Sequence, residues 1–110
     1  MKALFLDDER DPKDVTWISI GKYPWEIVRT YSDFCVYLAA QGIPDRISFD
    51  NDLGESKEGI DCAHFLVTAI MDGEHLPRDF SYTVHSKNNV AAERIRGLLD
   101  PFLEFWRNDR

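Results

Sequence analysis

The chain has 110 residues, of which 20 are acidic and 13 are basic, and its formal net charge is −7. This length predicts a single domain over residues 1–110. With 44% hydrophobic and 13% aromatic residues the chain can build a core, which excludes a disordered protein. The acidic balance excludes extended binding along duplex nucleic acid, because such binding needs clustered Lys and Arg.

No segment predicts export or membrane insertion. The apolar N-terminal run meets Asp7 and Asp8 at once, which makes it too short for the core of a signal peptide. No run approaches the roughly 18 apolar residues of a membrane helix. Cys35 and Cys62 lie in apolar-patterned segments and are expected to be reduced core thiols. We therefore expect a cytoplasmic protein with no membrane partner.

Short apolar runs predict four strands, in chain order Lys2–Leu6, Trp25–Arg29, Arg46–Phe49 and Phe80–Val84. The fourth run is expected to be buried on both faces, as in a parallel sheet. Between the first two strands, residues 8–23 show little helical period and predict a long loop that can carry a short strand at Trp17–Ile20.

Two amphipathic segments predict helices between the later strands. Ser32-Asp33 can cap the first helix, which places Phe34, Leu38 and Ala39 on one face and closes at Gly42. The second helix runs over Asp61–Met71 and has the clearest helical spacing of apolar residues in the chain.

A third helix is predicted after the last strand. Asn88 or Asn89 can cap it, and its first part covers Ala91–Leu99. Pro101 is expected to break or kink it before Phe102–Trp106, because proline lacks the backbone N–H that a helix interior needs.

Alternating strands and helices imply parallel pairing with right-handed crossovers. The first crossover lacks a good helix. The fold class is therefore α/β, a small open parallel sheet of flavodoxin-like type. We expect about four strands in the order 2-1-3-4, flanked by about three helices.

Carboxylates follow the first and third predicted strands. Ligands bind beyond the carboxyl ends of open parallel sheets, and the strand order sets these two strands side by side. Converging carboxylates repel one another, so either their pKa values rise or a cation neutralises them. Oxygen ligands favour Mg²⁺ or Mn²⁺. The predicted metal ligands are Asp7, Asp8, Asp50 and Asp52.

Polar groups also follow the second and fourth strands. His85 is expected at the crevice, where neighbouring carboxylates would raise its pKa and let it donate a proton near neutral pH. Arginine suits phosphate because its fork donates two parallel hydrogen bonds. The predicted catalytic residues are His85 and Asp50. The predicted phosphate- and substrate-binding residues are Arg10, Arg29, Thr30, Ser86 and Asn88.

Five short stretches follow in a specific order, namely Leu6–Pro12, Val28–Tyr31, Ser48–Gly54, Gly59–Asp61 and Val84–Asn88. Together they resemble the cyclic-phosphate-processing receiver-like family, whose members are relatives of the response-regulator receiver domain. The resemblance spans residue 3 to about residue 99 and includes a His-Ser-x-Asn signature at positions 85–88. Asn51 stands where that family usually has His, which removes one possible acid–base group.

The resemblance implies roles for individual residues. Asp7 and Asp8 match the acid pair that holds Mg²⁺ in receivers, Asp50 matches the phosphoacceptor, and Ser86 matches the hydroxyl residue that ends the fourth strand. Receivers also have a fifth strand preceded by a Lys, which this chain lacks, as does the cyclic-phosphate-processing group. For that group the implied role is the handling of cyclic phosphate ends, such as those left on cleaved RNA.

Three functions remain open at this point. The leading one is a metal-assisted phosphoesterase that opens a cyclic phosphodiester in a small phosphorylated ligand or in cyclic-phosphate-ended RNA. The second is a non-catalytic acidic module that binds a phosphorylated ligand or inhibits a basic protein partner. The third is a phosphoacceptor receiver that uses Asp50.

Overall fold

The computed structural model describes residues 1–108. Its four strands are β1 (Ala3–Leu6), β2 (Trp25–Val28), β3 (Arg46–Phe49) and β4 (Ser81–Val84). Its three α-helices are α1 (Tyr31–Gln41), α2 (Gly59–Met71) and α3 (Asn89–Asn108). The strands pair in parallel in the order β2-β1-β3-β4, which confirms the predicted fold class and strand order.

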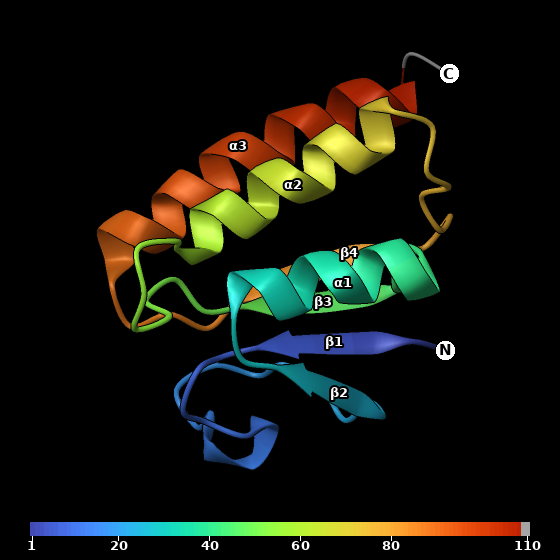
Figure 1. The fold of residues 1–110 in the computed structure, drawn as a ribbon. Coiled ribbons are helices and arrows are strands. Elements are labelled where there is room, and N and C mark those ends of the chain that lie inside the picture. Colours follow the sequence, from blue (N-terminus) through green and yellow to red (C-terminus); the bar gives the residue numbers. More distant parts are fainter. Residues whose placement is uncertain (109–110) are drawn as a thin grey trace.

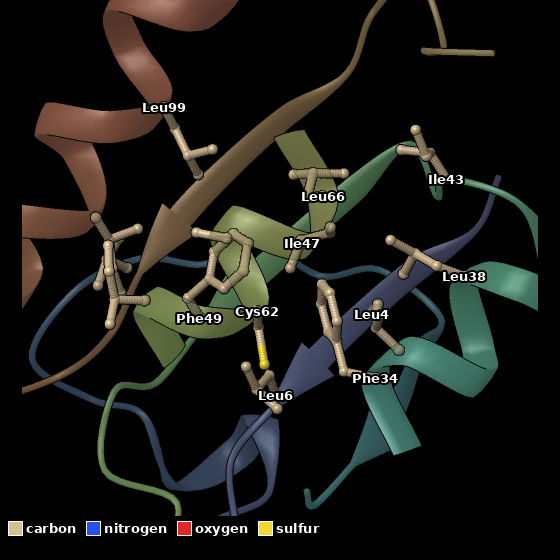
Figure 2. Close-up of a cluster of buried hydrophobic side chains, with 14 of the residues drawn as sticks. Leu4, Leu6, Phe34, Leu38, Ile43, Ile47, Phe49, Cys62, Leu66 and Leu99 are labelled. Atoms are coloured by element: carbon tan, nitrogen blue, oxygen red, sulfur yellow. The ribbon is translucent and has the colours of Figure 1, made fainter. Parts of the chain in front are cut away.

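The helices all pack on one face of the sheet. Alternate residues of a strand point to opposite faces, so Leu4 and Leu6 point to the helices whereas Phe5 points the other way. In Figure 1, α2 and α3 lie side by side above the strands, and α1 is drawn across β3 and β4. Figure 2 shows the shared core, to which strands and helices contribute Leu4, Leu6, Ile47, Phe49, Phe34, Leu38, Leu66 and Leu99. Both cysteines are free thiols, Cys62 fully buried in this core and Cys35 half-buried.

The long first crossover covers the opposite face of the sheet. It contains one 3₁₀ turn, η1 (Pro12–Asp14), and it packs Val15 and Ile20 against Phe5 in a second, smaller core (Figure 1, blue). The short strand predicted at Trp17–Ile20 is wrong, because residues 17–20 form a loop. These side chains lie on the face of the sheet rather than along its edge, so the segment has no strand to pair with.

Helices α1 and α2 begin earlier than predicted. Thr30 caps α1 by accepting a hydrogen bond from the Asp33 amide at 3.0 Å, so Ser32-Asp33 lie inside the helix. Ala39 is exposed rather than on the buried face with Phe34 and Leu38. Helix α2 starts at Gly59, two residues before the predicted start. The Glu58 amide donates a hydrogen bond to Asp61 Oδ2 at 2.8 Å, which closes the first turn.

Helix α3 runs unbroken through Pro101, so of the predicted break or kink the break is wrong. The carbonyl that loses its hydrogen bond belongs to Gly97, four residues earlier and exposed, so water can satisfy it. Leu99 and Leu103 on either side of the proline are buried in the core and hold the two halves in line. Within residues 1–108, even this longest helix is too polar to cross a membrane.

Strand β4 lies at the edge of the sheet, which corrects the expectation that both of its faces are buried. Tyr82 and Thr83 are half-exposed, and only Val84 is buried. Val84 and the next residue, His85, are both buried. They lie at the end of the sheet where Asp7 and Asp50 follow β1 and β3.

Candidate functional site

Three polar residues stand side by side where β1, β3 and β4 end. Leu6, Phe49 and Val84 are register partners, so the next residue on each strand falls at the same level. The backbone pairing continues for one more step, with the Asp50 amide donating to Leu6 and the His85 amide donating to Phe49, both at 2.9 Å. The side chains of Asp7, Asp50 and His85 are thereby brought together at the arrowhead end of the sheet (Figure 1).

Asp7 is fully buried, and hydrogen-bond donors surround it. Its Oδ1 accepts from the amides of Glu9 and Arg10 at 2.9 and 2.8 Å, and its Oδ2 lies 3.0 Å from His85 Nε2. Burial alone would raise the pKa of Asp7, but these donors outweigh it and hold the pKa below its ordinary value. Asp7 is therefore ionised at neutral pH.

His85 is fully buried rather than exposed at the crevice, which corrects the predicted placement of its ring. The ring stacks on Phe5 with centroids 4.5 Å apart, and its Nδ1 lies 2.7 Å from Ser48 Oγ. Because ionised Asp7 can only accept, Nε2 carries the proton and Nδ1 accepts from Ser48, whose oxygen accepts in turn from Thr83 at 2.9 Å. Burial lowers the pKa of His85 against the opposing effect of Asp7, so the expected rise is also wrong and the ring is neutral.

Asp50 is the carboxylate whose charge is least satisfied. It is 6% exposed, and within residues 1–108 its carboxylate receives one hydrogen bond, from the Asn51 amide to Oδ1 at 2.9 Å. Burial, and then the nearby charge of Asp7, raise the pKa of Asp50 to about 6. The oxygen Oδ2 is left for a ligand.

Asp8 and Asp52 lie at the outer rim of this cluster. Asp8 is half-buried and Asp52 is exposed. Burial raises the pKa of Asp8, and the carboxylates of Glu9, Asp7 and Asp52 raise it further. The Asp8 carboxylate lies over Gly54, where an added Cβ would come within 3.0 Å of Asp8 Oδ2. Asp52 Oδ1 accepts from the Gly54 amide at 3.0 Å, which shapes the loop that faces Asp8.

The donor set suits a hard divalent cation. One ligand atom each from Asp7, Asp50 and His85 lie within 4.8 Å of one another. The imidazole nitrogens are both engaged, so the groups left for a cation are carboxylate oxygens, which Mg²⁺ and Mn²⁺ prefer. Burial and the charge of Asp7 raise the pKa of Asp50 despite the nearby Arg10, so a cation bound beside Asp50 would favour its ionised form. Of the four predicted metal ligands, Asp7 and Asp50 lie together, while Asp8 and Asp52 flank them.

The two predicted phosphate-binding arginines differ in their surroundings. Arg10 Nη1 lies 3.6 Å from Asp7 Oδ2, and the charge of Arg10 lowers the pKa of Asp50, so its guanidinium faces the cluster. Arg29 donates to the carbonyls of Asp7 and Arg10 at 3.2 and 2.7 Å and forms an ion pair with Asp11 at 2.7 Å. In this structure Arg29 holds the loop after β1, and Arg10 is the arginine that faces the carboxylates.

Thr30, Ser86 and Asn88 shape the turns around the site. Thr30 caps α1. Ser86 Oγ accepts from the Asn88 amide at 3.1 Å, and Asn88 Oδ1 accepts from the Ala91 amide at 3.1 Å, which confirms Asn88 as a cap of α3. In all three residues the side-chain oxygen accepts a hydrogen bond from a backbone amide.

Asn51 joins the site to α2. It is buried, its Oδ1 accepts from the Ile60 amide at 3.4 Å, and its Nδ2 donates to Glu58 at 3.2 Å. A Cβ on Gly59 would lie 1.9 Å from the Asp50 carbonyl oxygen, so only glycine lets α2 approach this loop. The residue that stands in place of the family's usual His therefore anchors the helix that backs Asp50.

Sequence reasoning missed the hydroxyl pair behind His85 and the aromatic residue above it. Ser48 and Thr83 occupy matching positions on β3 and β4, which the alternation of the two strands could have placed on one face. Trp17 Nε1 donates to the His85 carbonyl at 2.9 Å, and no pattern in the sequence links two residues 68 positions apart.

The chain matches the family described as the cyclic-phosphate processing receiver domain over residues 2–101. A solved structure described as the trimeric coiled coil of yeast Spc42 fused to another structure shares the fold, with a TM-score of 0.56 over 98% of this chain and 82% of that one. Its sequence identity of 21% limits that likeness to the fold. No curated protein matches the chain. The family match covers the acid pair, the third-strand loop and the His-Ser-x-Asn segment, and the chain therefore belongs to the cyclic-phosphate processing receiver domain family.

Proposed function

We propose that this protein is a divalent-metal-assisted phosphoesterase that opens a cyclic phosphodiester, in a nucleotide or at the end of an RNA. Family membership supports the cyclic phosphate as the group acted on. The observation that carries the catalytic proposal is Asp50, a buried carboxylate with one oxygen free and a pKa of about 6. In the metal-free protein this carboxyl titrates near neutral pH, and a bound cation would lower its pKa and favour the ionised form that can take a proton from water.

The carboxylates of Asp7, Asp8 and Asp50 would hold Mg²⁺ or Mn²⁺. Such an ion, when bound, neutralises charge on the phosphate and lowers the pKa of a water. The hydrogen bonds from His85 and from two amides keep Asp7 ionised and fixed in place, so His85 acts on the site through Asp7. This is a positioning role in place of the direct proton transfer predicted for His85.

Asp50 and Arg10 would act on the substrate itself. Arg10 faces the carboxylates and can donate its fork to the phosphate oxygens. Asp50 would orient the attacking water at Oδ2 and take its proton as the new P–O bond forms. That proton is then available to the ring oxygen that leaves phosphorus, so the cyclic diester becomes a monoester with the addition of one water.

The test is a hydrolysis screen with 2′,3′-cyclic nucleotides, cyclic dinucleotides and cyclic-phosphate-ended RNA, each with and without Mg²⁺ or Mn²⁺. We expect metal-dependent opening of at least one substrate class, and a loss of rate of at least about 10²–10⁴-fold in Asp50→Asn, because this change removes both an acid–base group and a carboxylate that would hold the cation. Asp79→Asn is the matched control, because Asp79 is exposed before β4 at the opposite end of the sheet.

Two outcomes would count against the proposal. Turnover that Asp50→Asn and Asp79→Asn reduce equally would remove Asp50 from the mechanism. A folded protein that binds these compounds and turns none over would instead be a binding module, the second function that the sequence left open.

A further inference from the structure

Trp17 stands over the end of β4 and is fixed there by its polar edge. It comes from the loop on the helix-free face of the sheet, and its Nε1 donates to the His85 carbonyl at 2.9 Å. The side chain is half-buried against the small core around Phe5. An indole held at both its apolar body and its N–H has a defined orientation, so its faces can position other groups.

Two cations lie on this one indole. Lys87 Nζ is 4.4 Å from the ring centroid, and the guanidinium carbon of Arg10 is 5.1 Å from it. Both distances lie within the range of cation–π attraction. Arg10 comes from the loop after β1 and Lys87 from the loop after β4, so Trp17 gathers positive charge from two separate loops.

The surroundings of the two cations differ. Arg10 faces Asp7 at 3.6 Å, whereas the ion pairs found among residues 1–108 do not include Lys87. Lys87 is exposed and lies two residues after His85, whose side chain lies together with the carboxylates of Asp7 and Asp50. Like charges repel, so holding two cations on one ring is favourable when an anion binds between or beside them.

We propose that Lys87 and Arg10, held by Trp17, form the phosphate-binding pair of the site. The ligand class is a phosphate ester presented together with a divalent cation, because the carboxylates take the cation and the Trp17 pair takes the phosphate oxygens. This deepens the proposed function and rests on it for the identity of the substrate. Lys87 is then a binding residue, and Trp17 is a positioning residue.

The geometry also explains why Lys87 takes a role that sequence reasoning gave to Arg29. The Arg29 guanidinium is already engaged with two backbone carbonyls and Asp11. An ammonium on a flexible stem needs no fixed fork and can follow a phosphate as its geometry changes during the reaction. Lys87 therefore supplies a mobile charge beside the more fixed Arg10.

The test is calorimetric titration of inorganic phosphate into the Mg²⁺-containing protein at low ionic strength. We expect Lys87→Gln to weaken phosphate binding by about 10- to 100-fold, the usual range for a charged hydrogen bond, and Lys87→Arg to restore most of it. Lys22→Gln, which makes the same charge change at an exposed position near the opposite end of β2, should change binding by less than about twofold.

Trp17→Leu separates positioning from folding. It keeps apolar cover over Phe5 but removes the ring on which both cations lie. We expect weaker phosphate binding with an unchanged rise in melting temperature on addition of Mg²⁺. Loss of the Mg²⁺ response together with phosphate binding would mean that Trp17 only supports the fold, and would overturn its positioning role.

Phosphate binding and hydrolysis of a cyclic ester are measured separately, so the two proposals can fail independently. Phosphate binding that depends on Lys87, in a protein that hydrolyses no cyclic ester, would overturn the phosphoesterase and keep the phosphate-binding pair. Hydrolysis of a cyclic ester together with equal phosphate binding by wild type, Lys87→Gln and Lys22→Gln would overturn the pair and keep the phosphoesterase. A wild-type protein that binds no phosphate in the presence of Mg²⁺ would also overturn the pair.

Discussion

Asp7 and Asp50 are the same residue type a few ångströms apart, and their environments move their pKa values in opposite directions. Two backbone amides and His85 stabilise the charge on Asp7, so its pKa falls. Asp50 receives one amide and faces the charge of Asp7, so its pKa rises to about 6. In the metal-free protein Asp7 therefore keeps its charge at neutral pH, whereas Asp50 exchanges a proton near pH 6.

The raised pKa of Asp50 makes stability depend on pH. The folded protein binds this proton more tightly than the unfolded chain, so ionising Asp50 lowers the free energy of unfolding. This destabilisation is absent below the ordinary pKa of 3.8 and complete above about pH 6. Asp50→Asn removes the charge and keeps the shape. We expect the metal-free variant to be more stable than wild type by about 1–3 kcal/mol at pH 7 and nearly equal to it near pH 4.

Urea denaturation of both proteins in the presence of a chelator, across pH 4–7, measures this difference. Asp7 and His85 titrate in both proteins, so their contributions largely cancel in the comparison. A stability difference that stays constant over this range would contradict the raised pKa of Asp50.

His85 has a structural role that its polar character does not suggest. His85→Ala would remove a buried ring, its stack on Phe5, and the partners of both Asp7 and Ser48. We expect a loss of about 2–4 kcal/mol in the free energy of unfolding, measured by urea denaturation at pH 7. His64→Ala, at an exposed position on α2, should stay within about 0.5 kcal/mol of wild type.

The sequence pointed to His85 but not to its orientation. Its place after an apolar strand predicts that it lies at the carboxyl end of the sheet, and that is correct. Whether a side chain at a strand end points into the protein or out of it depends on what covers that face. Here the cover is Trp17 and the small core around Phe5, which belong to a loop without periodicity.

At the scale of elements, the junction between β3 and α2 determines where Asp50 sits. The Gly59 amide donates to the Asn51 carbonyl at 2.8 Å, and the start of α2 packs directly against the loop that follows β3. Any side chain at position 59 would push the helix away from the Asp50 backbone. The position of the carboxylate is thus coupled to the first residue of the helix.

Gly59→Ala should therefore destabilise the protein by about 1–3 kcal/mol and weaken Mg²⁺ binding, because its Cβ would lie 1.9 Å from the Asp50 carbonyl oxygen. Gly97→Ala is the control on α3, where an added Cβ meets nothing within 4 Å. That change should raise stability by up to about 1 kcal/mol, the helix propensity difference between the two residues. Thermal unfolding and Mg²⁺ titration of both variants would check this, and equal effects at the two positions would contradict it.

The helices show which features the local sequence predicts and which depend on tertiary packing. Apolar spacing correctly located α1 and α2, because a core-facing helix must repeat its buried residues. Pro101 was expected to break α3, but burial of Leu99 and Leu103 on the same core keeps the helix continuous. The free-energy cost of the hydrogen bond lost at Pro101 can be read from the local sequence. The stabilisation from burying Leu99 and Leu103 depends on α2, which packs alongside and lies elsewhere in the sequence.

At the scale of the whole molecule, the strand order and the meeting of Asp7, Asp50 and His85 at the carboxyl ends of the strands followed from pattern alone. Parallel strands end at one edge, so the residues after β1, β3 and β4 had to meet there. The position of the positive charges could not be predicted from the sequence pattern. Lys87 lies 70 or more residues along the chain from Arg10 and Trp17, and all three residues lie in loops. An acidic protein of net charge −7 thus keeps two cations on the ring of Trp17.

We propose that the carboxylates at the carboxyl ends of β1 and β3 hold a divalent cation. The most direct measurement is the melting temperature of the wild-type protein and Asp50→Asn at pH 7.5 as Mg²⁺ is added. We expect Mg²⁺ to raise the melting temperature of wild type in a saturable way, since a ligand that binds only the folded state stabilises it, and we expect Asp50→Asn to abolish this rise. An equal Mg²⁺ response in the two proteins would mean that these carboxylates do not hold the cation.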